Sequence, residues 1–329
     1  MTVMTAEATA FRSPPGGMRA VLEASANALR RGEPAALAVV VATEGSTYVR
    51  CGAMALFGAD TQVGWLSGGC LEPEIERWAQ QAVLLSQLDW LDIDTRDDED
   101  LLSGSALGCR GRLHVALLPL QSLPGWDGIV EAWLRDPSPL RLDINGDGEV
   151  VAVAAAQEQR WKLAVAETKA SAWQLDIPPP PTVLVLGAGP ETPTLLPLLR
   201  NLGWVTTLVE RRPRWRPLAA LADVVVEQAP DAALAQLSES AFDASLVMHH
   251  NFELDREALA ALSWRDIGFI GLLGPTRRRD DLFRVLAPDV RDALSPCLHA
   301  PVGLDLGGHG PEAIALSIAA QLHAYRHSP

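Results

Sequence analysis

Cysteine is scarce in this sequence, and the few cysteines lie far apart. Only four occur in 329 residues. None belongs to the Cys-x-x-Cys pair of a zinc site or to the dense framework of a disulfide scaffold, so neither class is indicated. A Ser/His/Asp order, an HExxH helix and the lysine of a phosphate-binding loop are absent too. The commonest sequence signatures of hydrolases, metalloproteases and ATPases are therefore missing.

Long apolar runs and excess positive charge are also lacking. No stretch approaches the length of a membrane span, and the N-terminus lacks the basic-then-apolar pattern of a signal peptide, so we expect a cytoplasmic protein without a membrane partner. The formal net charge is −14, which would make nucleic acid or an anionic lipid surface repel the chain as a whole. The length, with 48% hydrophobic and 21% charged residues, is typical of a two-domain globular protein.

The first part of the chain predicts an α/β domain. Residues 1–17, which contain Ser13-Pro14-Pro15-Gly16-Gly17, are expected to be a disordered lead-in. Apolar spacing of three and four residues after Met18 predicts a helix, and the apolar run 36–42 predicts a buried strand. The domain is expected to span 18–120, with further strands at 62–66 and 113–118 and a helix at 74–88.

Residues 121–181 are expected to be connecting structure. They contain Asp143-Ile144-Asn145-Gly146-Asp147-Gly148, which resembles the start of a calcium loop. The twelfth position of such a loop would be Ala154, where a bidentate glutamate is needed. The run therefore favours a hairpin turn between two β-rich segments. Four prolines at 178–181 then predict a stiff spacer at a domain boundary.

The remaining residues, 182–329, predict a Rossmann-like, doubly wound parallel sheet. Strand, glycine turn, helix and strand alternate, with strands expected at 183–186, 205–209, 224–226, 245–248 and 269–270 and a long final helix at 311–325. Gly187-Ala188-Gly189 partly matches the dinucleotide fingerprint, although Thr192 stands where glycine or alanine is usual. Glu210 ends the second strand, where an acid would bind a ribose hydroxyl. The alternatives are a nucleotide-like ligand at Gly187, Gly189 and Glu210, or a Rossmann fold that binds nothing.

Two glycine-flanked cysteines stand out in the first domain. In Ser67-Gly68-Gly69-Cys70 a strand leads into a helix that opens with Pro73. Backbone N–H groups at such a helix start suit an anion, and the positive helix end favours the thiolate of Cys70. Cys109 lies in a second glycine-rich loop just before a strand. Each loop has a plain alternative, a tight turn whose cysteine packs as a small hydrophobic residue.

Three loops of the second domain add weaker candidates. The pair His249-His250 ends a strand, and since adjacent histidines point apart, at most one is expected to serve a site; His250 is the candidate. Arg277 and Gly307 lie in glycine-containing loops before predicted helices. Together with the cysteine loops, these turns indicate a phosphorylated, sulfur-seeking ligand held between the two domains.

The chain resembles the XdhC/CoxI family, the accessory proteins of xanthine dehydrogenase and related molybdenum hydroxylases. The resemblance rests on several motifs in this order: residues 43–54, Ser67-Gly68-Gly69-Cys70-Leu71-Glu72, Gly187-Ala188-Gly189, residues 250–255, 267–271, 300–307 and 311–318. It departs from the family pattern at Val49, at residues 190–192 and at residues 273–277. These departures bear on nucleotide binding more than on the family.

The resemblance implies a molybdenum cofactor-binding chaperone rather than a turnover enzyme. Such a protein protects the cofactor, in its molybdopterin or dinucleotide form, assists its sulfuration and delivers it to an apo-hydroxylase, working with a cysteine desulfurase. By position, Cys70 is the candidate for contacting the metal or the transferred sulfur, with Cys109 and His250 as further catalytic candidates. A homodimer is expected. The alternatives are an NAD(P)-dependent oxidoreductase using the Rossmann domain and a pure protein–protein adaptor.

Overall fold

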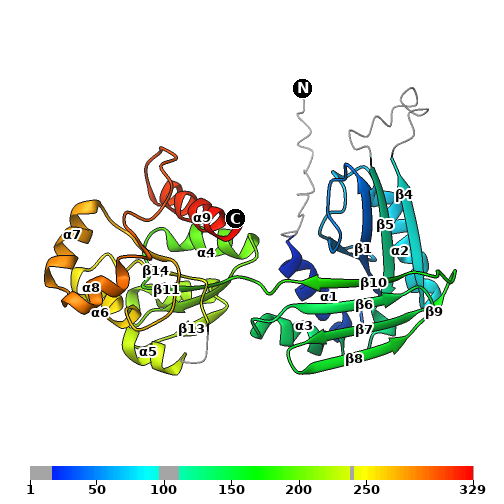
Figure 1. Cartoon of the computed structure of the whole chain (residues 1–329), viewed down its shortest axis with the longest axis horizontal. Helices are drawn as coiled ribbons and strands as arrows, with labels where there is room; N and C mark the ends of the chain where they lie inside the picture. The colour runs from blue at the N-terminus through cyan, green and yellow to red at the C-terminus, as the bar shows by residue number, and fades with distance from the viewer. Residues whose placement is uncertain (1–16, 96–110, 238–240, 329) are drawn as a thin grey trace, which may run out of the picture. The chain divides into compact units, whose positions relative to one another are not determined.

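The structure is a computed structural model that describes residues 17–95, 111–237 and 241–328. The chain divides into two compact units: the first ends at Pro179 and the second begins at Pro180 (Figure 1). Each unit has hydrophobic core clusters of its own. No helix in the described part of the chain is both long enough and apolar enough to cross a membrane.

Unit 1 is built on two β-sheets. Its helices are α1 (Met18–Arg31), α2 (Glu72–Leu85) and α3 (Trp126–Arg135). Its strands are β1 (Ala35–Gly45), β2 (Met54–Gly58), β3 (Gln62–Val63), β4 (Gln87–Asp94), β5 (Gly111–Pro119), β6 (Leu140–Asn145), β7 (Glu149–Ala154), β8 (Gln157–Lys162), β9 (Ala164–Val165) and β10 (Ala172–Ile177). The larger sheet has the order β3-β2-β1-β5-β4-β9, and the smaller one has the order β10-β6-β7-β8.

The central strand β1 is buried on both faces, which explains its unbroken apolar sequence. Ala36, Ala38 and Val40 face the cluster that includes α2, whereas Leu37 and Val39 face the cluster on the other side. Side chains alternate between the two faces of a strand, so a strand covered on both sides must be apolar at every position. The predicted strand at 36–42 is confirmed, and it extends to Gly45.

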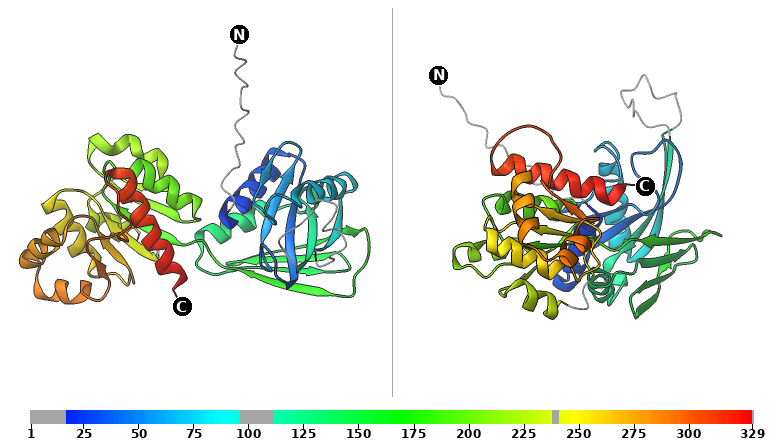
Figure 2. Two further views of the ribbon diagram at one scale, coloured as in Figure 1. Left: turned by 90° about the horizontal axis from the view of Figure 1, so that it is seen from above. Right: turned by 60° about the vertical axis from the view of Figure 1, so that its left-hand side comes forward.

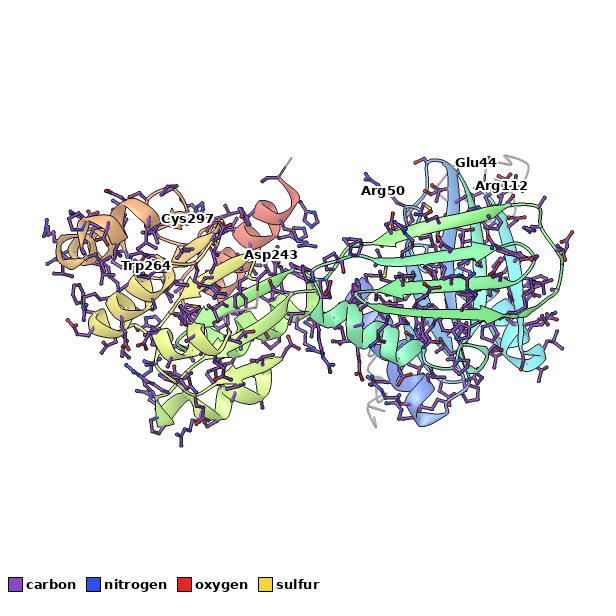
Figure 3. All side chains as sticks on the ribbon, turned by 60° about the horizontal axis from the view of Figure 1, so that its bottom comes forward. Glu44, Arg50, Arg112, Asp243, Trp264 and Cys297 are labelled. Atoms are coloured by element: carbon purple, nitrogen blue, oxygen red, sulfur yellow. The ribbon has the colours of Figure 1, made fainter. Side chains whose placement is uncertain are left out.

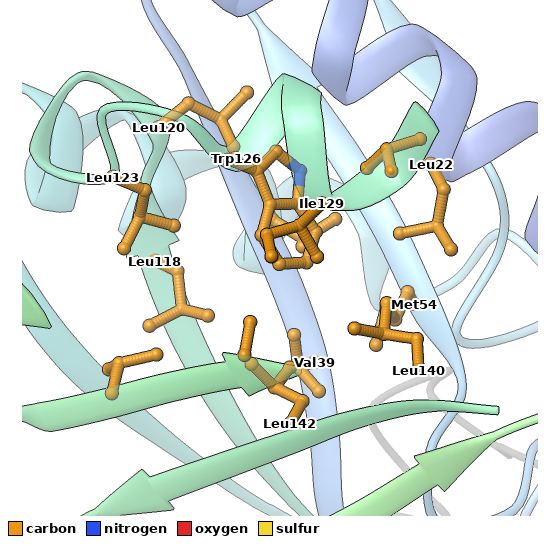
Figure 4. Packing of buried hydrophobic residues seen from close by; sticks show 14 of the residues in the cluster. Leu22, Val39, Met54, Leu118, Leu120, Leu123, Trp126, Ile129, Leu140 and Leu142 are labelled. Carbon is orange, nitrogen blue, oxygen red and sulfur yellow. The ribbon is translucent and has the colours of Figure 1, made fainter. Parts of the chain in front are cut away.

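The limits predicted for the first domain need correction, because residues 121–177 do not merely connect. They supply α3 and the smaller sheet to the same core as α1 and β1. Figure 4 shows Trp126 of α3 packed among leucine, isoleucine and valine side chains, and its indole Nε1 donates to Ser25 Oγ at 2.8 Å. Truncating such a buried tryptophan typically costs about 3–5 kcal/mol. The apolar stripe of α3 therefore fixes the segment to unit 1.

The hairpin predicted around residues 145–148 is confirmed. β6 and β7 pair antiparallel on either side of it, and Gly148 adopts a φ of 93°. A Cβ at Gly148 would lie 2.3 Å from the carbonyl oxygen of Leu163, so the turn needs glycine for space as well as for φ.

The proline run is tethered on both sides. On the unit 1 side, Trp133 Nε1 donates to the carbonyls of Ile177 (3.3 Å) and Pro178 (3.1 Å). On the unit 2 side, Val205 N donates to Pro181 O at 2.7 Å. Only Pro179 and Pro180 lie between these two tethers.

Unit 2 is the predicted doubly wound sheet. Its strands are β11 (Thr182–Leu186), β12 (Val205–Val209), β13 (Val224–Val226), β14 (Ala244–Val247), β15 (Ile270–Leu272) and β16 (Leu298–His299). Its helices are α4 (Thr192–Asn201), α5 (Pro230–Gln236), α6 (Phe252–Leu262), α7 (Thr276–Val285), α8 (Pro288–Leu294) and α9 (Pro311–His327). The order β13-β12-β11-β14-β15-β16, parallel throughout, is that of the Rossmann fold.

Helices cover both faces of this sheet. α4 and α9 lie side by side on one face, as the views in Figures 1 and 2 agree, and pack with Val183 and Val185 of β11. The alternate residues Leu184 and Leu186 face the cluster of α5, α6, α7 and α8. The carboxyl ends of β11 and β14 are neighbours, and the strand order reverses between them, so this is the edge where such sheets usually bind ligands.

Candidate functional site

The loop that carries Cys70 is organised around the hydroxyl of Ser67. Ser67 is 3% exposed. Its Oγ accepts hydrogen bonds from the backbone N–H groups of Gly69 (3.2 Å) and Leu71 (3.1 Å). These bonds close a tight turn, in which Gly69 takes a φ of 102° that favours glycine.

Glu72, the first residue of α2, holds the other side of this loop. Its carboxylate accepts from the backbone N–H groups of Leu66 (3.1 Å) and Ser67 (2.8 Å) and from the Ser67 hydroxyl. Four backbone amides of the loop are thus bound to side chains of the chain itself. The expected cluster of free amides for an anion is therefore reduced: among the described residues 66–72 of this loop, the amides of Gly68, Cys70 and Glu72 have no recorded acceptor.

The Cys70 thiol is exposed on this rigid loop. Its Sγ lies 3.6 Å from Ser67 Oγ, within hydrogen-bonding reach. It lines a small pocket with Ser67, Thr47, Tyr48 and Gly111, among other residues. Tyr48 is 60% exposed, a high value for an aromatic ring. The plain alternative, a cysteine packed as a small hydrophobic residue, does not match this exposure.

The second predicted cysteine, Cys109, lies outside the described residues. The flanking positions Thr95 and Gly111 both line the Cys70 pocket. Thr95 N and Thr95 Oγ1 donate to Gly111 O at 2.9 and 2.8 Å. A Cβ at Gly111 would lie 2.6 Å from Ser46 O, so glycine is required there for close packing.

The other two cysteines are less suited to bind a metal or sulfur. Cys51 is an exposed residue and Cys297 is partly buried, but partial burial raises the pKa of both thiols, which disfavours the reactive thiolate. Cys51 Sγ donates to Val41 O at 3.1 Å. Cys297 belongs to unit 2, where Figure 3 labels it. Among the residues that the structure describes, no three His, Cys, Asp or Glu side chains gather as a metal site.

A charged row crosses β1, β5 and β4 of unit 1, next to Gly111. Glu44 pairs in register with Arg112, and both are labelled at the same end of the sheet in Figure 3. Asp92 contacts His114 and accepts from Lys169 Nζ at 3.0 Å. Burial alone would raise the pKa of Asp92. The hydrogen bond from Lys169 and the charge of His114 together lower it by more, so the net shift of the pKa is downward. The row is internally paired.

In unit 2 the glycine turn after β11 is tightly packed. Gly187 has a φ of 91°, and a Cβ there would lie 2.5 Å from the ring carbon Cγ of His249. A Cβ on Gly189 would meet His250 Nε2 at 2.7 Å and a Glu191 carboxylate oxygen at 2.8 Å. Glycine is thus needed at both predicted positions, because other groups pack closely against the backbone there. Those groups are side chains of unit 2 and not a bound nucleotide.

Glu210 is held by two neighbours. It is 3% exposed, and its Oε2 accepts from Ala188 N at 2.8 Å. The Arg212 guanidinium donates to Oε1 at 2.9 Å and to Oε2 at 2.6 Å. Burial acts to raise the pKa of Glu210, but the hydrogen bonds from Arg212 and the Ala188 amide outweigh it and hold the pKa below 4.5.

These residues do not fit an NAD(P) molecule. Glu210, placed by the sequence for a ribose hydroxyl, is turned to Arg212, whose Nη1 and Nη2 also donate to the carbonyls of His249 and Ala188 at 2.8 Å each. The amide of Gly189, needed for a pyrophosphate, donates to Thr192 Oγ1 at 2.9 Å. An oxidoreductase reaction through this site is therefore not supported.

The two adjacent histidines point to different partners. His250 has a φ of 54°, unusual for a residue with a side chain, and its Nε2 lies 3.0 Å from a carboxylate oxygen of Glu191. His249 turns inward, with Nδ1 3.2 Å from Asp255 Oδ1. Asp255 is fully buried and also binds Arg278, whose Nε donates at 3.0 Å. His250 remains a candidate site residue. The side chain of His249 is held more firmly, because its partner Asp255 is itself bound by Arg278.

The last two predicted residues lie apart from this cluster. Arg277 is 90% exposed and is 3.7 Å from Asp281 of the same helix. Gly307 lines an open hollow with Gly274, Val302 and Ala313, among others, between the starts of α7 and α9. The structure brings Ser67, Gly68, Gly69 and Cys70 together in unit 1, and Gly187, Gly189, Glu210 and His250 together in unit 2.

Sequence reasoning missed the residues that hold these groups. Glu191, Arg212 and Arg278 were not predicted as site residues, and Asp255 appeared only as the last residue of the motif at 250–255. Their spacing gives one retrospective signal: Arg212 follows Glu210 by two residues, and Asp255 falls in the first turn of α6. An acid in the first turn of a helix, a few residues after a histidine that ends a strand, predicts a contact between the two side chains, as seen for Asp255 and His249.

Family models match both units. The model described as the XdhC and CoxI family matches residues 28–88, and the one described as the XdhC Rossmann domain matches residues 183–322. A probable xanthine dehydrogenase subunit of Bacillus subtilis (strain 168) is 26% identical over 323 residues, covering 88% of this chain and 92% of that protein. A crystal structure titled as a xanthine dehydrogenase from Bacillus halodurans is similar with a TM-score of 0.75 at 26% identity, covering 93% of this chain and 95% of that one.

Proposed function

Because the chain belongs to the XdhC and CoxI family, we propose that it is a xanthine dehydrogenase accessory protein that binds the molybdenum cofactor and delivers it. The proposal includes protection of the bound cofactor, assistance in its sulfuration and transfer to an apo molybdenum hydroxylase. The similarity to proteins titled as xanthine dehydrogenase components supports the choice of client.

The observation that carries the proposal is the Cys70 thiol. It is exposed, while Ser67 and Glu72 fix the backbone beneath it. Thiolate is a soft ligand that suits a metal–sulfur centre. A fixed, accessible thiol can contact such a centre without first reorganising the loop, whereas a buried cysteine cannot. Cys70 is the residue that we assign to the metal end of the cofactor.

The remaining parts of the proposal concern partners. A cysteine desulfurase would supply the sulfur, and this protein would hold the cofactor while an oxo ligand is exchanged. Its role is that of a cofactor carrier rather than of a turnover enzyme. A homodimer and a cytoplasmic location complete the proposal. Mass spectrometry of ligand released after co-expression with a cofactor-producing pathway tests whether the cofactor is bound at all.

The decisive experiment is activation of an apo-hydroxylase by the Cys70→Ala protein. Loss of even an outer-shell partner of a metal ligand typically costs about 10–100-fold in affinity or activity, so loss of a thiol that contacts the metal should reduce activation at least about tenfold. Cys297→Ala is the matched control, since it removes a partly buried thiol from unit 2, and it should activate normally. Undiminished activation by Cys70→Ala would remove Cys70 from the mechanism, and failure of the wild-type protein to carry cofactor would refute the function.

A further inference from the structure

The second unit has one side chain that is positioned for a ligand and has no assigned role. His249 follows β14, next to β11, at the point where the strand order reverses. Ligands of open α/β sheets bind outside the carboxyl ends of the strands at this point. The ring packs against Gly187, where even a methyl group would not fit.

The hydrogen bonds around His249 fix its tautomer. Asp255 Oδ1 lies 3.2 Å from Nδ1 and also accepts from the His249 backbone N–H at 3.1 Å. The other oxygen, Oδ2, accepts from Arg278 Nε and Nη2, a charge-assisted pair. A carboxylate only accepts, so Nδ1 must carry the proton. Nε2 of the neutral ring is then a hydrogen-bond acceptor.

The Nε2 atom is available to a ligand. It makes no recorded hydrogen bond within the described part of the chain, and the His249 side chain has no polar partner there besides Asp255. It is not one of the described buried polar atoms that lack a partner. The 6% of His249 that is exposed therefore includes this acceptor, and its ring cannot turn away, because Asp255 and Gly187 hold it.

The charges around this edge disfavour a phosphate. Three carboxylates, Glu191, Glu210 and Asp255, are at most 3% exposed. The two guanidinium groups that contact these carboxylates are paired with them, Arg212 with Glu210 and Arg278 with Asp255. Among the residues that the structure describes, the recorded hydrogen-bond partner of the Glu191 carboxylate is the imidazole of His250. Three carboxylates against two guanidinium groups leave an excess of one negative charge among these five side chains, so a phosphate would meet net repulsion here.

We propose that His249 Nε2 binds an uncharged aminopyrimidinone ring, by accepting a hydrogen bond from one of its N–H groups. This inference rests on the proposed function, since a pterin and a guanine base share that ring and both occur in forms of the molybdenum cofactor. Asp255 and Arg278 are positioning residues, which hold the tautomer that makes Nε2 an acceptor. Unit 2 then recognises a ring by its N–H edge, and not a pyrophosphate.

The test measures binding of three probes to the full chain by isothermal titration: free pterin, guanosine and NADH. We expect the wild-type protein to bind pterin or guanosine and not NADH. His249→Phe keeps a flat ring against Gly187 but has no acceptor. The loss of one such bond should weaken binding about tenfold. His323→Ala, on α9, is the matched control and should bind as the wild type does.

A second variant, Asp255→Asn, tests the tautomer. The charged Arg278 donates twice to Oδ2, so we expect the amide oxygen to face it and the NH2 group to face His249 Nδ1, with the His249 backbone N–H losing its acceptor. Nδ1 then becomes the acceptor and Nε2 the donor, which reverses the hydrogen bond offered to the ring. We expect a loss of ring binding at least as large as that of His249→Phe, while circular dichroism shows that the fold is retained.

The possible results separate this inference from the proposed function. Unchanged binding in His249→Phe or Asp255→Asn, binding of neither ring by the wild type, or binding of NADH as tight as that of the rings would each overturn the inference. Hydroxylase activation is measured independently on the same proteins. Normal activation together with any of those results leaves the proposed function standing. Preference for pterin over guanosine assigns unit 2 to the pterin end of the cofactor, and the reverse assigns it to the nucleotide end.

Discussion

The two units use similar strand–glycine–helix turns for different purposes. In unit 1 the turn at residues 66–72 binds four of its backbone amides to its own side chains but leaves a thiol exposed. In unit 2 the amides of Ala188 and Gly189 are bound by the side chains of Glu210 and Thr192. The group left available to a ligand there is the imidazole nitrogen Nε2 of His249. A glycine-rich turn is therefore an anion site only when its amides are left free, and here the neighbouring carboxylates and hydroxyls decide that.

The largest effect is expected where the unit 2 turn is most crowded. Gly187 and Gly203 both have a φ of 91°, but a Cβ on Gly187 would lie 2.5 Å from His249 while Gly203 has nothing within 4 Å. Gly187→Ala should lower the free energy of unfolding by about 3 kcal/mol or more, and Gly203→Ala by about 1 kcal/mol from backbone strain alone. Urea denaturation measures both. Equal losses would mean that the turn is not tightly covered.

A smaller effect is expected from opening the charge pair beneath that turn. Arg212→Met leaves the Glu210 carboxylate buried without a cation, which should cost about 3 kcal/mol at neutral pH. Arg214→Met, an exposed neighbour stacked on Trp215, should cost less than about 0.5 kcal/mol. Chemical denaturation at pH 7 measures the free energy of unfolding of both variants. An equal loss in the two would show that the Arg212–Glu210 pair does not stabilise the fold.

The pH dependence sharpens this test. In the wild type the Glu210 pKa is lowered on folding, so the stability it contributes is present above its ordinary pKa of 4.5 and is lost as the pH falls below that value. Without Arg212, burial raises the pKa of Glu210, and acidification then relieves the buried charge. The stability difference between wild type and Arg212→Met should shrink as the pH falls from 7 to 4. A constant difference would contradict the origin assigned to the shift.

The smallest effect concerns the unit 1 turn. Glu72→Ala removes the acceptor of the Leu66 and Ser67 amides and of the Ser67 hydroxyl, for an expected loss of about 2 kcal/mol. Glu74→Ala, at an exposed position on the same helix, is the matched control. Hydroxylase activation should fall for Glu72→Ala in parallel with Cys70→Ala, because the thiol loses its fixed support. Retained activation would show that the loop need not be rigid.

The sequence predicted the fold of unit 2 well because its signals are local. The apolar runs of β11, β12 and β14 and the glycine turn at Gly187 follow one another along the chain, and short-range pattern is enough to place them. Unit 1 was harder. β2 and β4 were not predicted, and α3 was taken as a connector, since its packing on α1 depends on residues about a hundred positions away.

The candidate sites divide in the same way. The loop around Cys70 could be recognised because its hub, Ser67, and its thiol are three residues apart. The partners of Glu210 and His249 could not, because Arg212 bridges three separate strand ends and Arg278 reaches Asp255 from another helix. Spacing along the chain predicted that an acid would stand at Glu210, but not what it would face.

The short tether between the units has a practical consequence for biochemistry. Proteases cut best where several residues of main chain can leave the surface and adopt an extended shape. Between the Pro178 carbonyl held by Trp133 and the Pro181 carbonyl held by Val205, only two residues remain, and both are imino acids with a fixed φ. Limited digestion should therefore fail to release the halves by cleavage at this junction, and obtaining them separately would require expression as individual gene fragments.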